Sequence, residues 1–175
     1  MTTSPTSLDA ISIEAAKPED LSTVIEIIDE AAAWLHSQGI TRQWPSPAPK
    51  SFWEFIEEEI AKGEVYLARL ADGSAIGTLR FEWNDADLWR NDPEGGGYVH
   101  SFATHPRVRG HQIGVAMLTW AKEHVRARGR RYLRLDCWGG NQPLCDYYTR
   151  LGFAFCGFVR EGDWADALFQ IDACA

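Results

Sequence analysis

Residues 98–138, YVHSFATHPRVRGHQIGVAMLTWAKEHVRARGRRYLRLDCW, decide the fold of this chain. The segment opens with a strand over Tyr98–Thr104, turns through a run of arginine and glycine, and continues with helical apolar spacing over Ile113–Arg128. Gly129 ends that helix, and the apolar run Tyr132–Trp138 follows as a second strand. Because a helix crosses over the sheet between them, the two strands are predicted to lie parallel.

The flanking sequence extends this unit into a larger sheet. Strand-like runs are predicted at residues 11–15, 65–70, 75–83, 153–159 and 167–171, and helices at residues 18–36, 52–61 and 143–151. The predicted fold is α/β with mixed α+β character. We expect a mixed, mostly antiparallel sheet of about seven strands, with a parallel pair at its centre and about four flanking helices.

The chain has 175 residues and a mass of 19.7 kDa, which suits one domain. We expect a disordered tail over residues 1–8 and a single domain over residues 9–175. No apolar run is long enough for a membrane helix, and the N-terminus lacks the features of a signal peptide, so a cytoplasmic protein without a membrane partner is predicted. The four cysteines follow neither metal-ligand nor disulfide spacing, and we expect no metal and small buried thiols.

The net charge of −8 argues against nucleic acid as a partner. The charge is uneven, because residues 1–97 carry 18 acidic and 7 basic side chains, whereas residues 98–135 carry 8 basic ones and Glu123 as the single acid. A compact polyanionic ligand next to the basic stretch would explain this asymmetry. A solvated helix face beside an arginine-rich turn would explain it equally well.

The turn Arg107–Gly114 lies directly between a strand and a helix. The first turn of a helix leaves backbone amides without partners, and their dipoles converge on a point of partial positive charge. Gly110 and Gly114 would let a ligand approach the backbone closely, and Arg109 and His111 would add to the positive field. The turn therefore predicts a phosphate-binding site.

Two ordered motifs resemble the GCN5-related N-acetyltransferases (GNAT), which transfer an acyl group from coenzyme A thioesters to amines. The turn signature of that family, Arg or Gln, two residues, Gly, one residue, Gly or Ala, stands here as Arg109-Gly-His-Gln112-Ile-Gly114. Gln112 replaces the middle glycine, so a left-handed backbone there would be strained. The second family pattern, an Asn followed seven residues later by Tyr and then by Gly-Phe, stands as Asn141, Tyr148 and Gly152-Phe153.

The resemblance implies a GNAT-like fold and acetyl-CoA as the cofactor. The phosphates would lie on the turn, and the amide arm of the cofactor would insert between the two parallel strands, which would have to splay. The implied cofactor-binding residues are Phe102, Ala103, Thr104, Arg109, Gly110, His111, Gln112, Ile113, Gly114 and Asn141.

Transfer to an amine requires a base, because an amine with a pKa of about 10.4 is neutral in only about one molecule in 2,500 at pH 7. His100 is the first candidate, since it lies on the strand before the turn and has an ordinary pKa near neutrality. Its side chain is expected on the same face as Tyr98 and Phe102. A satisfied core histidine is the alternative interpretation, and Glu82 and Asp87 are rival bases.

Tyr148, by its place in the family pattern, would be the acid that protonates the leaving thiolate. Aromatic and acidic side chains in the regions that line the acceptor cleft of the family would suit a cationic or heterocyclic amine, although they would also suit a small core. These candidate substrate-binding residues are Trp34, Trp44, Trp83, Asp87 and Trp89.

The sequence thus predicts an acetyl-CoA-dependent N-acetyltransferase, an acyltransferase acting on a primary amine of a small molecule by direct attack in a ternary complex. A protein or peptide N-acetyltransferase, for N-termini or lysines, remains open because the charge of the chain does not choose between acceptors. A non-catalytic, coenzyme A-binding regulatory module also remains open. The resemblance is compatible with a homodimer.

Overall fold

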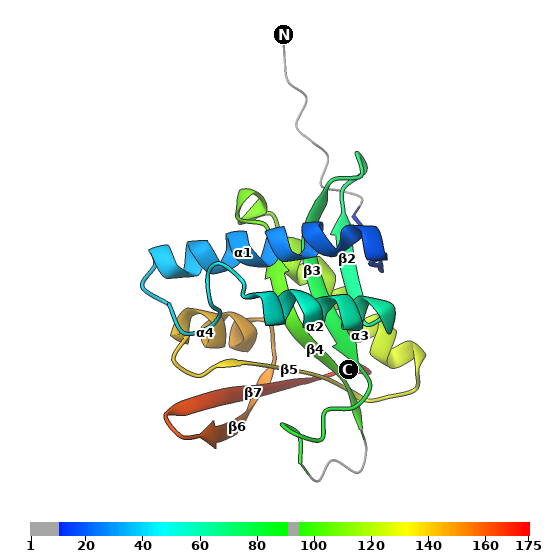
Figure 1. The fold of residues 1–175 in the computed structure, drawn as a ribbon. Helices are drawn as coiled ribbons and strands as arrows, with labels where there is room; N and C mark the ends of the chain where they lie inside the picture. Colours follow the sequence, from blue (N-terminus) through cyan, green and yellow to red (C-terminus); the bar gives the residue numbers. More distant parts are fainter. Residues whose placement is uncertain (1–10, 91–94) are drawn as a thin grey trace.

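A computed structural model describes residues 11–90 and 95–175. These residues form a seven-stranded sheet in the order β1-β2-β3-β4-β5-β7-β6 (Figure 1). The β4–β5 pair is parallel and the other neighbouring pairs are antiparallel, which confirms the predicted sheet. The strands are β1 (Ser12–Ala15), β2 (Val65–Arg69), β3 (Ala75–Glu82), β4 (Gly96–Thr104), β5 (Tyr132–Trp138), β6 (Ala154–Glu161) and β7 (Trp164–Asp172).

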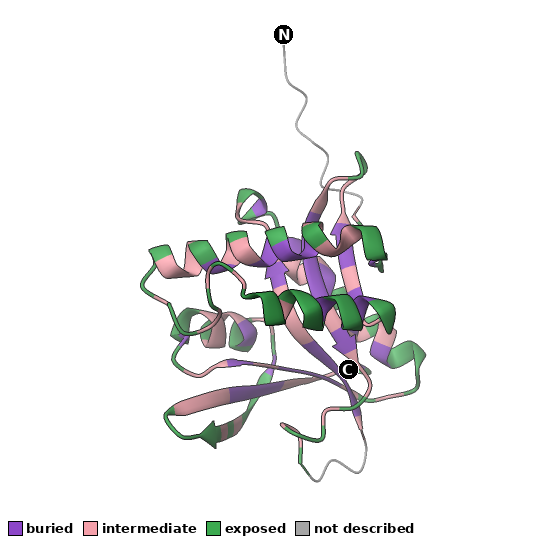
Figure 2. Cartoon of the chain, in the orientation of Figure 1, coloured by how far each residue is buried: buried purple, intermediate pink, exposed green. Residues whose placement is uncertain are grey.

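The helices cover both faces of the sheet. α1 (Leu21–Ser37) and α2 (Lys50–Ala61) lie on one face, in front of the sheet in Figure 1, and α3 (Ile113–Ala127) lies behind it. α4 (Gln142–Arg150) follows β5 and packs, through Tyr148, into the same core as α3. The sheet is therefore sandwiched, and its central strands are the most deeply buried part (Figure 2).

The parallel pairing of β4 with β5 stops before either strand ends. It runs from Gly96 opposite Tyr132 to Val99 opposite Leu135. Beyond this point β4 stays paired with β3, and β5 stays paired with β7. The sheet therefore opens between two strands that each keep an outer partner, so the splay implied by the resemblance is present.

A β-bulge interrupts β4 at Ser101, whose φ is 47°. Arg80 lies opposite His100 and Thr78 lies opposite Ala103, so β4 has one more residue than β3 between these two pairs. A bulge of this kind bends the strand and increases its local twist. The bend occurs where β4 leaves β5, and it therefore contributes to the splay.

The bulge also changes which face the following side chains meet. Phe102 packs into the core under α3, and Ala103 packs into the core under α1 and α2. His100 lies opposite Arg80, whose guanidinium contacts Glu59 of α2. The expectation that His100 and Phe102 share a face is therefore wrong, because the extra residue breaks the alternation of the strand.

The predicted elements are present with small shifts at their ends. α2 begins at Lys50 rather than residue 52, and β4 begins at Gly96 rather than residue 98. The expectation of buried thiols holds for Cys137 but is wrong for Cys156 and Cys174, which are exposed on β6 and after β7. The tail predicted for residues 1–8 lies outside the described residues.

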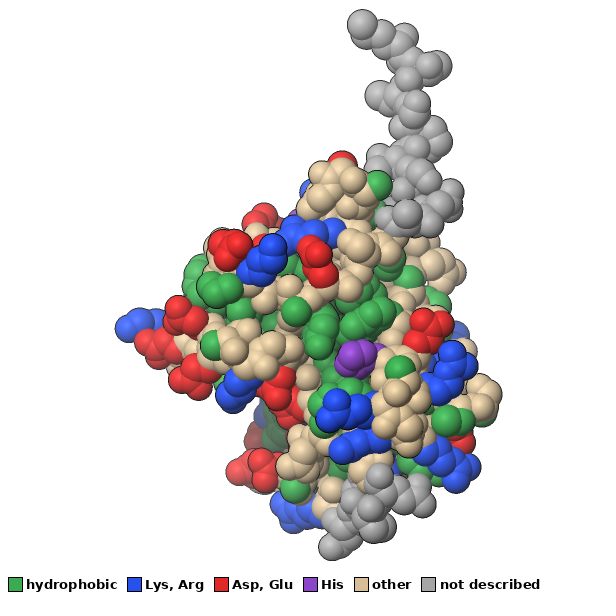
Figure 3. Space-filling model, turned by 90° about the vertical axis from the view of Figure 1, so that its right-hand side faces the viewer, with side chains coloured by type: hydrophobic (Ala, Val, Ile, Leu, Met, Phe, Trp, Pro, Cys, Tyr) green, Lys and Arg blue, Asp and Glu red, His purple; other side chains and the backbone are tan. Residues whose placement is uncertain are grey.

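The charge asymmetry of the sequence is visible on the surface. In Figure 3 acidic side chains gather mainly over the left half of the molecule, Lys and Arg lie on both sides, and hydrophobic side chains lie between them. Within residues 11–90 and 95–175, no helix combines the length and the apolar character that crossing a membrane requires.

Substitution of Gly97 tests the packing of β4 against α3. A Cβ atom at Gly97 would overlap the ring of Phe81 and lie 2.5 Å from Cγ2 of Val125, both rigid neighbours. We expect Gly97→Ala to lower the free energy of unfolding by about 2 kcal/mol. Gly77→Ala, whose Cβ would meet the side chain of Met117 and the backbone oxygen of Ala103, is expected to cost about 1 kcal/mol, because the flexible Met117 side chain can adjust. Urea denaturation of both variants measures the difference; equal costs would contradict this account of the packing.

Candidate active site

A cavity of about 780 Å³ opens beside the splay. Its walls are the C-terminal half of α1, residues 38–44, β4 from Val99 onward, the turn before α3, and α4. The predicted site residues that line it are Trp34, Trp44, His100, Phe102, Ala103, Thr104, Arg109, Gly110, Gln112, Ile113, Gly114, Asn141 and Tyr148. Residues that are far apart in the sequence thus converge on one concave site, as ligand sites generally do.

The N-terminus of α3 presents free backbone amides to this cavity. The amides of Arg109 and His111 donate to carbonyls inside the turn. Five others have no acceptor within the part of the chain that the structure describes: Gly110, Gln112, Ile113, Gly114 and Val115. Orphan N–H groups at a helix start form an anion-binding site.

Gly110, Gln112 and Gly114 shape the turn for different physical reasons. Gly110 has a φ of +78°, and a Cβ there would meet no atom within 4 Å. Gln112 has a φ of 63°, the left-handed conformation that is less favourable for Gln than for Gly. At Gly114 a Cβ would lie 2.8 Å from the hydroxyl oxygen of Tyr147, so α4 approaches α3 closely only because this residue is glycine.

Arg109 lies between the turn and α1. Its guanidinium is placed over the ring of Trp34, and burial lowers its pKa from the ordinary value of 12.5. A guanidinium this strongly basic still stays charged at neutral pH. The turn therefore carries one fixed positive charge at the cavity wall in addition to its amides.

His100 is held between two carboxylates. Its Nδ1 atom lies 3.1 Å from Oδ1 of Asp136, and its Nε2 atom lies 3.3 Å from Oδ2 of Asp85. The second contact is an ion pair without hydrogen-bond geometry. Burial by itself lowers the pKa of His100, but the contacts with Asp136 and Asp85 outweigh burial and hold the pKa above 6.5.

Tyr148 lies in the floor of the cavity. Its ring packs against Phe153 and Phe169, with centroid distances of 5.9 and 5.6 Å. Burial raises the pKa of its phenol well above 10. The hydroxyl therefore keeps its proton at any physiological pH and can act as a hydrogen-bond donor.

The loop of residues 38–49 is fixed to the opposite wall by Gln43. The side-chain carbonyl of Gln43 accepts from the backbone N–H of Trp138 and from Nδ2 of Asn141, both at 3.2 Å. Oδ1 of Asn141 in turn accepts from the N–H of Leu144 as the N-cap of α4. Both ends of the Asn141 side chain are thus used within the protein.

Arg42 makes a second attachment for the same loop. Its guanidinium pairs with Asp163 at 3.0 Å and lies over the rings of Trp138 and Trp164, 5.6 and 5.8 Å from their centroids. The ion pair is exposed and contributes little by itself, but the stacking adds apolar contact. The loop therefore closes one side of the cavity.

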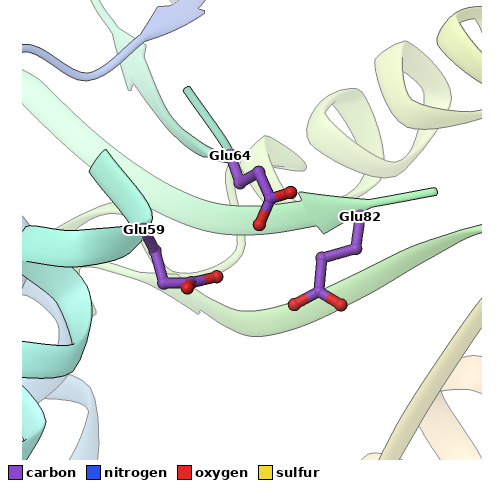
Figure 4. A group of neighbouring side chains, drawn as sticks. All are labelled: Glu59, Glu64 and Glu82. Carbon is purple, nitrogen blue, oxygen red and sulfur yellow. The ribbon is translucent and has the colours of Figure 1, made fainter. Parts of the chain in front are cut away.

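Glu82 faces a different cluster. The carboxylates of Glu59, Glu64 and Glu82 converge between α2 and the sheet (Figure 4), with oxygens within 4.8 Å of one another. Arg80 pairs with Glu59 at 3.0 Å and also with Glu82. The guanidinium of Arg80 and the ammonium of Lys62, which lies 2.6 Å from Glu59, offset part of this negative charge. Glu82 does not line the cavity.

Four other predicted site residues also lie away from the cavity. Trp83 stacks on His124 of α3, with ring centroids 5.4 Å apart, on the face opposite α1. Trp89 lies 4.7 Å from the guanidinium of Arg134, and Asp87 and His111 are exposed. The structure thus brings Trp34 and Trp44 to the cavity, but not the aromatic residues of the loop after β3.

Asp136 and Gln43 line the cavity and were not among the predicted residues. Asp136 had a signal in the sequence, because it is the one carboxylate on the mainly apolar run YLRLDCW of a central strand. Gln43 had none, since a loop contact across 98 residues of sequence leaves no local pattern. Asp85 likewise contacts His100 from the loop after β3, and no periodic pattern in the sequence predicts the conformation of a loop.

A model of the acetyltransferase (GNAT) family matches residues 26–153. The chain is 28% identical over 149 residues to the uncharacterised N-acetyltransferase YesJ of Bacillus subtilis, covering 82% of each protein. It is 30% identical over 101 residues to streptothricin acetyltransferase of Streptomyces lavendulae, covering 58% of this chain and 50% of that protein.

The fold is also similar to that of a solved structure, yncA of Salmonella typhimurium with its cofactor acetyl-CoA. The TM-score is 0.65 at 18% identity, over 94% of each chain. Because the family model covers most of the chain, this protein belongs to the acetyltransferase (GNAT) family.

The stability of the protein should depend on the charge of His100. A raised folded-state pKa means that this ion pair contributes fully below pH 6.5, the ordinary value, and that the contribution is lost as the pH rises through the folded-state pKa. We expect the free energy of unfolding of the wild type to fall in that window, by about 1.4 kcal/mol for each unit of pKa difference, relative to His100→Gln. Urea denaturation from pH 6 to 9 measures it, and parallel curves for the two proteins would refute the effect.

Proposed function

We propose that this protein transfers an acetyl group from acetyl-CoA to a primary amine of a small molecule, by direct attack in a ternary complex. The observation that carries the proposal is the continuity of one cavity. It joins the free amides at the start of α3, the unpaired edge of β4, and a group of ionisable side chains at Tyr148 and His100. This continuity would place an anionic cofactor and an acceptor in contact.

The residues present fit acetyl-CoA. The five free amides and Arg109 would hold the diphosphate. On the β5 side, residues 100–104 have no strand partner among the described residues, so their backbone could pair with the amide arm of the cofactor as an added strand does. When bound, acetyl-CoA supplies a thioester carbonyl that an amine can attack.

Two ionisable side chains of the cavity could carry the proton transfers of this reaction. Tyr148 keeps its proton and can donate it, or a hydrogen bond, to the departing sulfur. His100 lines the cavity, whereas Glu82 and Asp87 do not, so His100 is the proposed base. Because its pKa is raised, His100 would act through its neutral fraction, and turnover should increase as the pH rises above 6.5.

A small acceptor is favoured over a protein substrate. The loop held by Gln43 and Arg42 forms a wall of the cavity, and a walled cavity suits a small molecule better than an extended peptide. The name of the Streptomyces relative, streptothricin acetyltransferase, describes a small-molecule acceptor and agrees with this choice. The four free cysteines agree with a reducing compartment, and we propose the cytoplasm.

Incubation with acetyl-CoA and a panel of small amines, followed by assay of free thiol, tests the proposal. Thiol release with small amines supports it. Thiol release with peptides alone would instead favour a protein acetyltransferase. Coenzyme A binding without thiol release for any acceptor would favour a regulatory module.

Gly110→Val tests the cofactor end of the cavity. A branched side chain at Gly110 would stand where the diphosphate is proposed, and we expect the affinity for coenzyme A to fall at least about tenfold in isothermal titration. Gly129→Val is the matched control, since Gly129 ends the same helix with a φ of +74° and equally open surroundings. Both variants should lose about 1 kcal/mol of stability from backbone strain. Unchanged affinity in Gly110→Val would exclude the turn from the site.

Tyr148→Phe tests the acid. Removal of the hydroxyl should lower kcat by about a hundredfold without changing the affinity for coenzyme A. Tyr132→Phe, on β5 outside the cavity, is the control and should leave kcat unchanged. A Tyr148→Phe enzyme with normal kcat would rule out this tyrosine as the acid.

A further inference from the structure

Asp136 is the one carboxylate among the described residues that line the cavity. The other charged or ionisable side chains of the wall, apart from the tyrosines, are Arg109, Arg150 and His100. Two of these are permanent cations that suit phosphate groups. Asp136 therefore gives one part of the cavity a charge that the rest of its wall lacks.

The position of Asp136 is fixed by the sheet. Val99 and Leu135 are the last residues paired between β4 and β5, so His100 and Asp136 are the first residue of each strand beyond that pairing. The backbone of Asp136 is held from the other side by Leu168 of β7. The carboxylate thus stands at the apex of the splay, on a rigid element.

The charges around Asp136 do not cancel. His100 lies between Asp136 and Asp85, and even when its imidazole is protonated, one positive charge between two carboxylates leaves one unit of negative charge. Arg80, which also acts on His100, is already paired with Glu59 and Glu82. Oδ1 of Asp136 contacts His100, and within residues 11–90 and 95–175 no donor is hydrogen-bonded to Oδ2.

The same cavity offers apolar surface to the rest of a ligand. Leu35 and Ile40, from the end of α1 and the loop after it, line the cavity together with Trp44. A ligand that satisfies both features has a cationic head and an apolar or aromatic body.

We propose that Asp136 binds the ammonium group of the acceptor and that the site selects primary alkylamines with an apolar or aromatic body. This inference rests on the proposed function. His100, the proposed base, contacts both Asp85 and Asp136 and thereby also fixes the orientation of the Asp136 carboxylate. A hydrogen bond between charged groups contributes about 10- to 100-fold in binding, which is the selectivity we expect for an alkylammonium over a neutral ligand of the same shape.

The first measurement needs no variant. The coenzyme A-saturated wild type is titrated calorimetrically with 2-phenylethylamine, a cation at pH 7.5, and with its neutral counterpart 2-phenylethanol. The two ligands compare an ammonium group with a hydroxyl group on the same phenylethyl group. We expect the amine to bind at least about tenfold more tightly. Equal affinities, or tighter binding of the alcohol, would overturn the inference.

The second measurement uses Asp136→Asn, which removes the charge and keeps the shape. We expect KM for primary alkylamines to rise about 10- to 100-fold, and KM for acetyl-CoA and kcat/KM for neutral arylamines to change less than about threefold. Asp172→Asn is the matched control, because Asp172 pairs with Arg131 on β7 outside the cavity. Retention of coenzyme A affinity shows that the variant is folded.

The outcomes distinguish failure of the proposed acetyltransferase activity from failure of the proposed role of Asp136. A wild type that releases no thiol with either alkylamines or arylamines overturns the proposed function, and the inference with it. A wild type that acetylates alkylamines, together with an Asp136→Asn variant of unchanged alkylamine KM, overturns the role of Asp136 alone.

Discussion

The site depends on the point where two parallel strands stop pairing. β4 and β5 are hydrogen-bonded only as far as Val99 and Leu135, and each then continues beside its outer neighbour. A sheet can open in this way without leaving most backbone groups unsatisfied, because each strand keeps one paired edge. The opening exposes the inner edge of β4 and brings the ends of both strands, the turn before α3 and α4 around one cavity.

The same opening explains why charged groups can sit at the centre of the sheet. His100 and Asp136 follow the last paired residues, where the cavity begins, and Asp85 completes the group from the loop after β3. Buried charges are costly unless they are paired, and an arrangement of alternating signs reduces that cost. Such a group fixes the position and the charge of the side chains that it contains.

Most of the fold could be predicted because local sequence patterns, such as apolar spacing, determine its helices and strands. The structure contains the helices that the apolar spacing predicts at α1 and α3, the end of α3 before Gly129, and the strand–turn–helix–strand order. The free backbone amides of the turn before α3 were predictable for the same reason, since they follow from the place of the turn before a helix. The interior of the site was less predictable. One extra residue at Ser101 moved Phe102 to the other face, and Trp83 stacks under α3 rather than in the cavity. Contacts such as those of Asp85 and Gln43 arise from loops, where no periodicity reports on the path of the chain.

The side-chain carbonyl oxygen of Gln43 connects the loop after α1 with the segment that joins β5 to α4. It accepts from Trp138 at the end of β5 and from Asn141 at the start of α4, the helix that carries Tyr148. Any rearrangement of the loop after α1 that withdraws this oxygen removes one partner from the residue that caps α4. The conformation of that loop is thus coupled to the start of the helix that carries Tyr148, so a substitution at Gln43 would alter two walls of the cavity at once.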